Sequence, residues 1–364
     1  MKAGIVGLPN VGKSTLFNCL SNTKAQSANF PFCTIEPNHS IINVPDKRLV
    51  NLEEIVKPEK VIPATVEIVD IAGLVKGASK GEGLGNKFLA NIRETDAIIH
   101  VLRCFDNDNI THVDGSVDPV RDKEIIDIEL QLKDLESLTN RIEKVNRTAK
   151  SGDKDAIREK EILELAIAHV ESSNNIRSIN LDSADIHRYL RPLQLITSKP
   201  VLYVCNVDEN CINTSNEYVD SVKALISKEE ANLIILAAGI ESEINELDNY
   251  EERRMFLDDL GLDTPGSSKL INATYDLLNL QTYFTAGPKE VRAWTIPKKA
   301  TAPQAAGVIH SDFEKGFIKA EVISYDDYIN FKTEAKVKEA GKMRVEGKDY
   351  VVKNGDIIHF LFNI

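Results

Sequence analysis

Short apolar runs alternate with amphipathic stretches along most of the chain. The first run, residues 4–6, is followed by Leu16, Phe17, Cys19 and Leu20 on one face of a helix. Later apolar runs predict strands at 65–70, 97–105, 200–205 and 232–236. Strands that alternate with helices indicate a parallel sheet covered on both faces. We therefore expect an α/β fold with a doubly wound sheet.

A different pattern begins near residue 124, where apolar residues are spaced by three and four as in the seam of a coiled coil. Ser151 and Gly152 break it, and helical spacing then resumes. The pattern predicts an antiparallel helical arm inserted in the sheet domain, although a simple helix pair covering the sheet would also fit. The seam positions are Ile128, Leu132, Leu135, Leu138, Ile142 and Val145, then Ile157, Ile162, Leu165 and Ile167.

The pattern changes again near Leu280. Paired strands at 281–285 and 290–296, a short helix at 301–309 and further strands at 317–322 and 350–363 predict a small α+β module. Its basic residues either form a local basic face or are separately solvated: Lys289, Arg292, Lys298, Lys299, Lys315 and Lys319. We expect four segments: the sheet domain in two parts (1–122 and 199–279), the coiled-coil arm (123–198) and the C-terminal module (280–364).

Composition narrows the class of protein. The chain has 364 residues, ordinary hydrophobic content and no apolar run long enough to span a membrane. Its five cysteines include no CxxC pair, which favours a reducing compartment. A net charge of −12 argues against indiscriminate nucleic-acid binding but leaves room for a local basic patch. We expect a cytoplasmic protein with neither membrane nor DNA as partner.

Residues 7–14 match G-x-x-x-x-G-K-[ST] between the first strand and its helix. Gly7 and Gly12 allow backbone N–H groups to turn toward a phosphate at the positive end of the helix. Lys13 is long enough to reach the β- and γ-phosphates, and the Ser14 hydroxyl is a suitable ligand for Mg²⁺. The sequence therefore predicts a nucleoside triphosphate site.

Two further motifs fit a nucleotide switch. Thr34 lies in a polar loop where P-loop GTPases place a threonine that completes the Mg²⁺ shell. The strand at 65–70 ends in D-x-x-G, so Asp70 can hold Mg²⁺ through water and the Gly73 amide can contact the γ-phosphate. Leu74 stands where Ras-type proteins keep a water-orienting glutamine, so the catalytic group must come from elsewhere or hydrolysis is slow.

The base-recognition motif departs from the N-K-x-D of GTPases. The sequence at 206–209 is Asn-Val-Asp-Glu, with Val207 at the lysine position and Glu209 at the aspartate position. The GTPase aspartate pairs with guanine N1–H and the exocyclic amine, and adenine offers no matching pair there. We therefore predict relaxed or reversed base preference, with Asn206 available to read adenine. The backbone at Ala238 and Gly239 is expected to line the other side of the base.

A polar loop follows the strand at 97–105, at the sheet edge where doubly wound folds bind ligands. His112 in this loop could reach over the γ-phosphate and orient water. A loop histidine is more often a bystander, so the residues alone leave both interpretations open.

Together the motifs resemble the YchF group of Obg-like ATPases, over essentially the whole chain. The segments that carry the resemblance are GLPNVGKST (7–15), NFPFCTIEPN (29–38), DIAGLVKGAS (70–79), NVDE (206–209) and the ending that begins LQTYFTAGPKEVRAWTI. The resemblance implies a nucleotide domain interrupted by a coiled-coil arm, then a TGS domain of ubiquitin-like β-grasp shape. It also implies preference for ATP and association with ribosomes, for which we expect the large subunit and its rRNA.

The resemblance also implies roles for single residues. The phosphates would be contacted by residues 10–15, that is Asn10, Val11, Gly12, Lys13, Ser14 and Thr15. Ser14 and Thr34 would bind Mg²⁺, and Asn206 with its neighbours would read adenine. The family's loop histidine falls on His112, which favours a catalytic role. Asn10 suggests a K⁺ ion in place of an arginine finger.

We expect a slow ATPase whose nucleotide state sets ribosome binding, with Lys13, Gly73 and His112 serving hydrolysis. A GTPase with unusual base recognition is a rival enzyme. A binding module in which ATP only fixes a conformation belongs to another class. A redox sensor acting through Cys33 or Cys104 rests only on proximity to the switch segments.

Overall fold

The structure is a computed structural model that describes residues 1–22, 39–71, 84–107, 109–110, 115–227, 229, 231–247 and 249–363. Contacts divide these residues into two compact units. The first unit comprises 1–22, 39–40 and 68–270, and the second comprises 41–67 and 271–363. No helix in the described part of the chain is both long and apolar enough to span a membrane.

The predicted α/β sheet is confirmed, and its described strands follow the order β2-β4-β1-β5-β6-β7. Strands β1, β5, β6 and β7 are parallel, and Val101 on β5 pairs with Val204 on β6. The elements that alternate along this part of the sequence are β1 (Lys2–Val6), α1 (Lys13–Asn22), β2 (His39–Asn43), β4 (Thr65–Asp70), α3 (Leu84–Arg93), β5 (Ala97–Arg103), β6 (Val201–Asn206), α7 (Glu217–Ile226), β7 (Asn232–Leu236), α8 (Ala238–Glu246), α9 (Tyr250–Asp259) and α10 (Gly266–Leu277).

The central strands explain where a site can form. Every residue of β5 and β6 is buried, which is the reason their sequences are continuous apolar runs rather than alternating ones. Because β1, β5 and β6 are parallel neighbours, their carboxyl ends meet at one edge of the sheet. The segments that follow these strands therefore lie at the edge where doubly wound folds bind ligands.

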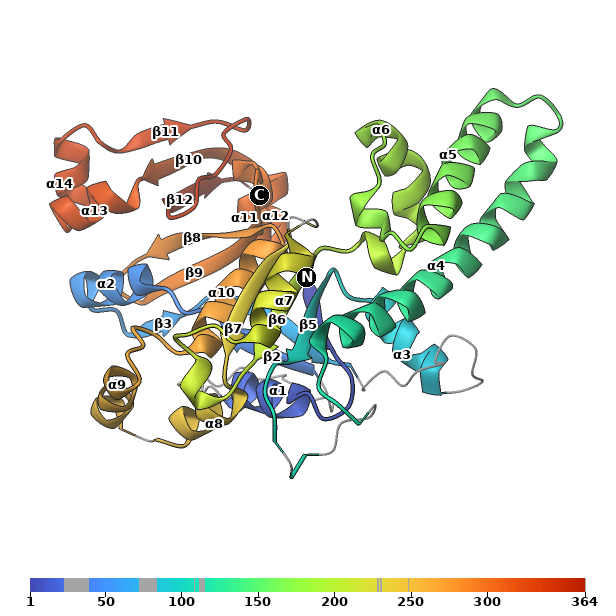
Figure 1. Cartoon of the computed structure of the whole chain (residues 1–364). Coiled ribbons are helices and arrows are strands. Elements are labelled where there is room, and N and C mark those ends of the chain that lie inside the picture. The colour runs from blue at the N-terminus through green and yellow to red at the C-terminus, as the bar shows by residue number, and fades with distance from the viewer. Residues whose placement is uncertain are drawn as a thin grey trace. The chain divides into compact units, whose positions relative to one another are not determined.

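The helical arm is also confirmed. It consists of α4 (Pro119–Ala149) and α5 (Lys154–Glu171), followed by the short helix α6 (Ser183–Asp185). Figure 1 shows α4 and α5 side by side, joined by a tight turn. Asp118 accepts from the backbone N–H of Val120 and Arg121 at the start of α4, and Asp153 accepts from Ala156 N–H at the start of α5. These caps satisfy orphan N–H groups and fix both helix starts.

The predicted seam is only partly correct. Leu138, Val145 and Ile162 belong to its buried core, whereas Ile128 and Leu132 are exposed. Ile157 and Leu165 are likewise exposed, so those parts of the prediction are wrong. In its first half α4 buries a different set of residues, several of them polar, so a prediction based on apolar spacing does not find them. This set includes Ile126, Glu129, Leu130, Gln131 and Asp134.

A buried carboxylate fixes the proximal part of α4. Asp134 accepts hydrogen bonds from the backbone N–H groups of Ile196 and Thr197, at 2.8 and 2.7 Å, and from the Thr197 hydroxyl at 2.7 Å. Burial raises the pKa of Asp134, and these donors act in the opposite direction. The segment that leads into β6 is thereby tied to the arm.

The second unit contains the β-rich C-terminal region. Its sheet has the order β11-β10-β12-β8-β9-β3, and its core includes Tyr283, Phe317 and Phe360. Strand β3 pairs in parallel with β9, a contact that the sequence pattern did not indicate. The elements are α2 (Lys47–Val56), β3 (Lys60–Ile62), β8 (Leu280–Ala286), β9 (Glu290–Pro297), α11 (Ala302–Ile309), α12 (Ser311–Lys315), β10 (Phe317–Ile323), α13 (Tyr325–Phe331), α14 (Glu334–Glu339), β11 (Arg344–Glu346) and β12 (Ile357–Phe362).

Two of the six basic residues singled out in this region contact neighbours within the chain. Lys289 precedes β9 and Lys298 follows it, so they lie at opposite ends of a strand about 27 Å long at 3.4 Å per residue. Lys298 pairs with Asp276 at 3.1 Å, and the Arg292 guanidinium stacks 3.8 Å from the Trp294 ring centroid. The single basic face formed by these residues therefore stays a prediction, with two of its members engaged by neighbours within the chain.

Candidate nucleotide site

The loop between β1 and α1 has the backbone that the glycine pattern requires. Asn10 and Gly12 both have positive φ, 65° and 90°. A Cβ on Gly7 would lie 2.8 Å from the Val101 carbonyl oxygen, so no side chain fits there. The Leu16 N–H donates to the Gly12 carbonyl at 2.9 Å and begins α1. The loop therefore ends at a helix N-terminus, which favours an anion.

Asn206, at the end of β6, ties this loop to the neighbouring strands. Its amide Nδ2 donates to the Val11 carbonyl at 2.9 Å, and its Oδ1 accepts from the Ala238 N–H at 2.9 Å. The side chain is buried, and a Cβ on Gly12 would lie 2.2 Å from Asn206 Nδ2. Asn206 thus has a positioning role that the sequence did not reveal, besides the predicted one of reading the base.

Lys13 and Asp70 meet at the same sheet edge. The Lys13 ammonium forms an ion pair with the Asp70 carboxylate at the end of β4. Lys13 is largely buried, whereas Ser14 and Thr15 are exposed in the first turn of α1. The Ser14 hydroxyl and the Asp70 carboxylate are hard oxygen donors of the kind that Mg²⁺ prefers, so this part of the chain fits the ion.

The base-side residues follow β6 and β7. Val207 is buried, and its N–H donates to the Leu236 carbonyl at 2.9 Å, so it fills the space between the strand ends. Glu209 is exposed at the start of a 3₁₀ turn, with its carboxylate available to solvent. Ala238 and Gly239 are the first residues of α8, which packs on α1. The predicted residues from the loop, β4, β6 and α8 are therefore brought to one edge.

Arg103, which the sequence analysis did not single out, organises the segment that follows β5. Its guanidinium is almost fully buried and donates to three backbone carbonyls, those of Phe105, Asn107 and Ile110, at 3.1, 3.2 and 3.0 Å. It also lies 4.7 Å from the Phe105 ring centroid. The available signal was a charged residue at the end of a buried, mostly apolar strand, because a buried charge needs partners.

Three predicted residues, Thr34, Gly73 and His112, lie outside the described residues. Among the residues that are described, no group of three or more His, Cys, Asp or Glu side chains forms a metal cluster. A magnesium site that uses serine, phosphate and water does not need such a cluster.

A buried charge network lies at the base of the arm. Lys123 on α4 pairs with Asp127 and Glu229, each at 2.6 Å. Arg177 also pairs with Glu229, at 3.0 Å, and the Tyr203 hydroxyl on β6 donates to the same carboxylate at 3.0 Å. The network joins the arm to a strand that ends at the nucleotide site.

His100 on β5 is buried beside this network, with its ring 5.5 Å from that of Tyr203. Its Nε2 has no hydrogen-bond partner among the described residues. Burial, and then the positive charges of Lys123 and Arg177, lower the pKa of His100 to about 3. The folded chain therefore holds the neutral imidazole.

His100 should make the chain less stable in mild acid. An unfolded histidine has a pKa of about 6.5, so below that pH protons bind the unfolded state preferentially. The stabilising contribution is complete above pH 6.5 and is lost as the pH falls toward 3. Between pH 7 and pH 5 the loss is about 2 kcal/mol. Urea denaturation at pH 7 and pH 5 measures the change in the free energy of unfolding. For His100→Phe this change should be smaller than for wild type by the loss given above. The control, His359→Phe at an exposed position, should show the same change as wild type. Equal losses in all three proteins would contradict the assignment.

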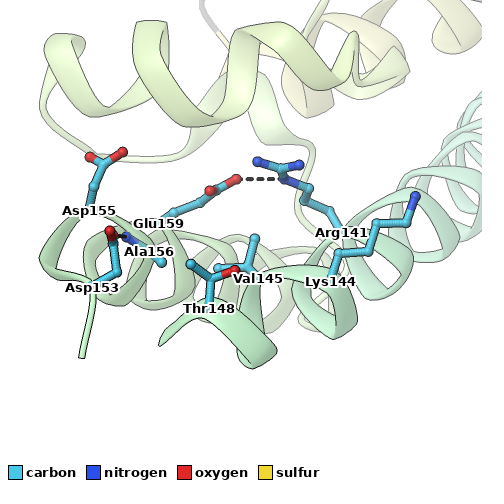
Figure 2. Close-up of a pocket in the computed structure, with 8 residues that line it drawn as sticks. All are labelled: Arg141, Lys144, Val145, Thr148, Asp153, Asp155, Ala156 and Glu159. Atoms are coloured by element: carbon cyan, nitrogen blue, oxygen red, sulfur yellow. Dashed lines mark hydrogen bonds and ion pairs between the residues drawn. The ribbon is translucent and has the colours of Figure 1, made fainter. Parts of the chain in front are cut away.

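The arm contains a polar pocket of about 350 Å³, drawn in Figure 2. Its charged groups are largely engaged: Arg141 pairs with Glu159 at 2.6 Å, and Asp155 accepts from the Tyr189 hydroxyl at 2.7 Å. The hydrogen bond from the Tyr189 hydroxyl contributes most to holding the pKa of Asp155 below its usual range. This pocket shares no residue with the nucleotide site and is a feature of the arm.

The glycine loop, its helix and the sheet edge define a P-loop nucleotide-binding protein. A family model described as 50S ribosome-binding GTPase matches residues 2–141, and the model YchF-GTPase_C, described as a protein of unknown function, matches 280–363. The chain belongs to the YchF family.

It is 57% identical to the ribosome-binding ATPase YchF of Pasteurella multocida, over 100% of this chain and 99% of that protein. The protein of that name from Bacillus subtilis is 53% identical, over 100% of both chains. The solved structure of the Schizosaccharomyces pombe YchF GTPase has a TM-score of 0.90 and 39% identity, over 99% of this chain and 97% of that one.

Proposed function

We propose that this chain is an ATPase that binds ribosomes and whose nucleotide state regulates that binding. The single observation that carries the choice of base is the end of β6. There Val207 is buried in place of the GTPase lysine, and Glu209 stands in place of the aspartate. The relatives from Pasteurella multocida, Escherichia coli and Bacillus subtilis are named ribosome-binding ATPases, which supports ATP hydrolysis and ribosome binding, while the Schizosaccharomyces pombe structure is titled a GTPase.

In this proposal the phosphates lie against the backbone of residues 10–15. Lys13 exchanges its contact with Asp70 for the β- and γ-phosphates. Ser14, Thr34 and Asp70 would hold Mg²⁺, which supplies charge neutralisation at the phosphates when bound. Asn10 would contact a K⁺ ion. The Gly73 amide contacts the γ-phosphate, and His112 orients the attacking water.

On the base side Asn206 and Glu209 face adenine, with the backbone of Ala238 and Gly239 opposite. We assign residues 1–122 and 199–279 to the nucleotide-binding domain, 123–198 to the coiled-coil arm and 280–364 to a TGS domain. The partner is the large ribosomal subunit and its rRNA, which places the protein in the cytoplasm with ribosomes.

Titration with ATP and GTP in the presence of Mg²⁺ tests the base assignment. The wild type should bind ATP more tightly than GTP. Glu209→Asp should shift the preference toward GTP, because a shorter carboxylate restores the GTPase geometry for guanine N1–H and the amine. A polar site can discriminate by up to about 10⁴-fold, so even a partial shift is measurable. Glu217→Asp, an exposed acidic change on α7, is the control and should leave the ratio unchanged. Equal or tighter GTP binding by the wild type would overturn the ATPase assignment.

A further inference from the structure

The distal end of the helical arm carries five basic residues, here called the basic tip: Arg141, Lys144, Arg147, Lys150 and Lys154. Only two acidic residues, Glu143 and Asp153, lie in the same stretch of sequence. The segment 141–154 therefore has a net charge of +3, whereas the whole chain has −12. The remainder of the chain is strongly acidic, so the basic tip is a local exception to the charge of the molecule.

Most of these charges are available to a partner. Lys144, Arg147, Lys150 and Lys154 are exposed, and their side chains have no ion pair or hydrogen bond within the described part of the chain. Figure 2 shows Arg141 reaching toward Glu159, whereas Lys144 points away from the labelled carboxylates.

The acidic residue nearest the turn has another role. The carboxylate of Asp153 accepts from the Ala156 N–H at 2.8 Å and caps α5, so it is engaged with backbone rather than with a tip lysine.

The backbone beneath the basic tip is well fixed. Val145 and Ala156 are buried in the arm core. The turn is closed by hydrogen bonds from Ser151 N–H to Thr148 O and from Gly152 N–H to Ala149 O, each 3.0 Å. Helix α4 has 31 residues, so at 1.5 Å per residue it is about 46 Å long. The basic tip is therefore displayed on a rigid support at the far end of that helix.

Compensation of the helix dipole explains only part of this pattern. That effect is confined to the last turn, which accounts for Arg147 and Lys150. Arg141 pairs with Glu159, but Lys144 lies before the last turn of α4 and Lys154 begins the next helix, where a positive charge opposes the dipole. Basic side chains that are placed without an intramolecular reason favour an external polyanion.

We infer that the basic tip binds the phosphate backbone of ribosomal RNA, an inference that rests on the proposed ribosome binding. Lysine and arginine neutralise phosphates without reading sequence, and such contacts release counterions. The acidic remainder of the chain repels RNA, so the charge asymmetry orients the molecule with the arm's end toward the ribosome.

The test compares two full-length triple variants in binding to purified large ribosomal subunits, with a non-hydrolysable ATP analogue, at several salt concentrations. The tip variant is Lys144→Gln, Arg147→Gln, Lys150→Gln. The control variant is Lys160→Gln, Lys223→Gln, Lys319→Gln, which removes the same charge from lysines paired with acidic neighbours at 3.5, 3.7 and 4.0 Å. At low salt the tip variant should bind at least about tenfold more weakly than wild type. The plot of log K against log salt should also be less steep for this variant, by about 3 in all, or about 1 per lost phosphate contact. The control should match wild type.

Each outcome is decisive. Both variants should keep the ATPase rate measured without ribosomes, because none of the altered residues lies at the nucleotide site. The thermal midpoint of the tip variant should fall only slightly, through the lost compensation of the α4 dipole by Arg147 and Lys150. If wild type binds no subunits, the proposed function fails. If wild type binds and the tip variant matches the control, the proposed function stands and the inference is wrong. A weaker tip variant with an unchanged salt slope would also overturn it, because the tip would then contact ribosomal protein rather than phosphate.

Discussion

Replacing Gly12 by alanine is expected to weaken ATP binding by about 100-fold, through strain of about 1–3 kcal/mol and the loss of a hydrogen bond worth about 1 kcal/mol. Gly12 has φ of 90°, which an L-residue rarely adopts. Its new Cβ would lie 2.2 Å from Asn206 Nδ2, so either the loop or the Asn206 amide must move. Either shift breaks the bond to the Val11 carbonyl that holds the loop against β6. Isothermal titration with ATP and Mg²⁺ measures the loss.

A control variant at a second glycine distinguishes the effect of the local clash from the effect of backbone strain alone. Gly341 also has positive φ, 67°, but a Cβ there would meet nothing within 4 Å. Gly341→Ala should lower stability modestly and leave ATP affinity within about twofold of wild type, since only strain is added. An unchanged affinity for Gly12→Ala would show that the loop adapts freely and that the contact with Asn206 does not organise the site.

The fold could be predicted largely from hydrophobic pattern. Strand β7 was predicted at its observed bounds, because an apolar run between polar turns has few alternatives. The order of strands was not predictable from periodicity, and neither was the pairing of β3 with β9, which are more than 200 residues apart. Periodicity reports which face is buried but not which element covers it.

The sequence motifs predicted the residues of the candidate site, but they did not predict the residues that hold the site in place. The loop glycines and Asp70 follow a pattern whose chemistry is local. Asn206 was identified as a base reader, yet its two hydrogen bonds join segments about 200 and 30 residues away. Arg103 and His100 lie inside an apolar strand, where sequence alone shows a buried polar residue but not its partners. Such supports depend on three-dimensional placement.

The catalytic assignment has the second large expected effect: His112→Ala should slow ATP hydrolysis by about 10²- to 10⁴-fold, the usual range for a positioned general base or water-orienting group. Leu74 cannot orient water, so the sequence offers no second group at the usual position. His112 follows β5 in the sequence, and Arg103 at the end of that strand donates to the carbonyls of Phe105, Asn107 and Ile110. Single-turnover hydrolysis, with ATP affinity measured alongside, checks the prediction: the rate should fall while the affinity changes by less than about threefold, because water orientation matters in the transition state rather than in binding.

The same variant distinguishes an ATPase from a binding module. His359→Ala, at an exposed position on β12, is the control and should hydrolyse ATP like wild type. If His112→Ala loses hydrolysis and remains bound to ribosomes with ATP, hydrolysis serves release, as expected for a nucleotide-regulated cycle. If it loses hydrolysis and its association and release are unchanged, ATP acts as a conformational ligand and hydrolysis is incidental. A wild-type rate in His112→Ala would remove the histidine from the mechanism, and another group of the chain would then have to orient the water, because an apolar residue at position 74 cannot do so.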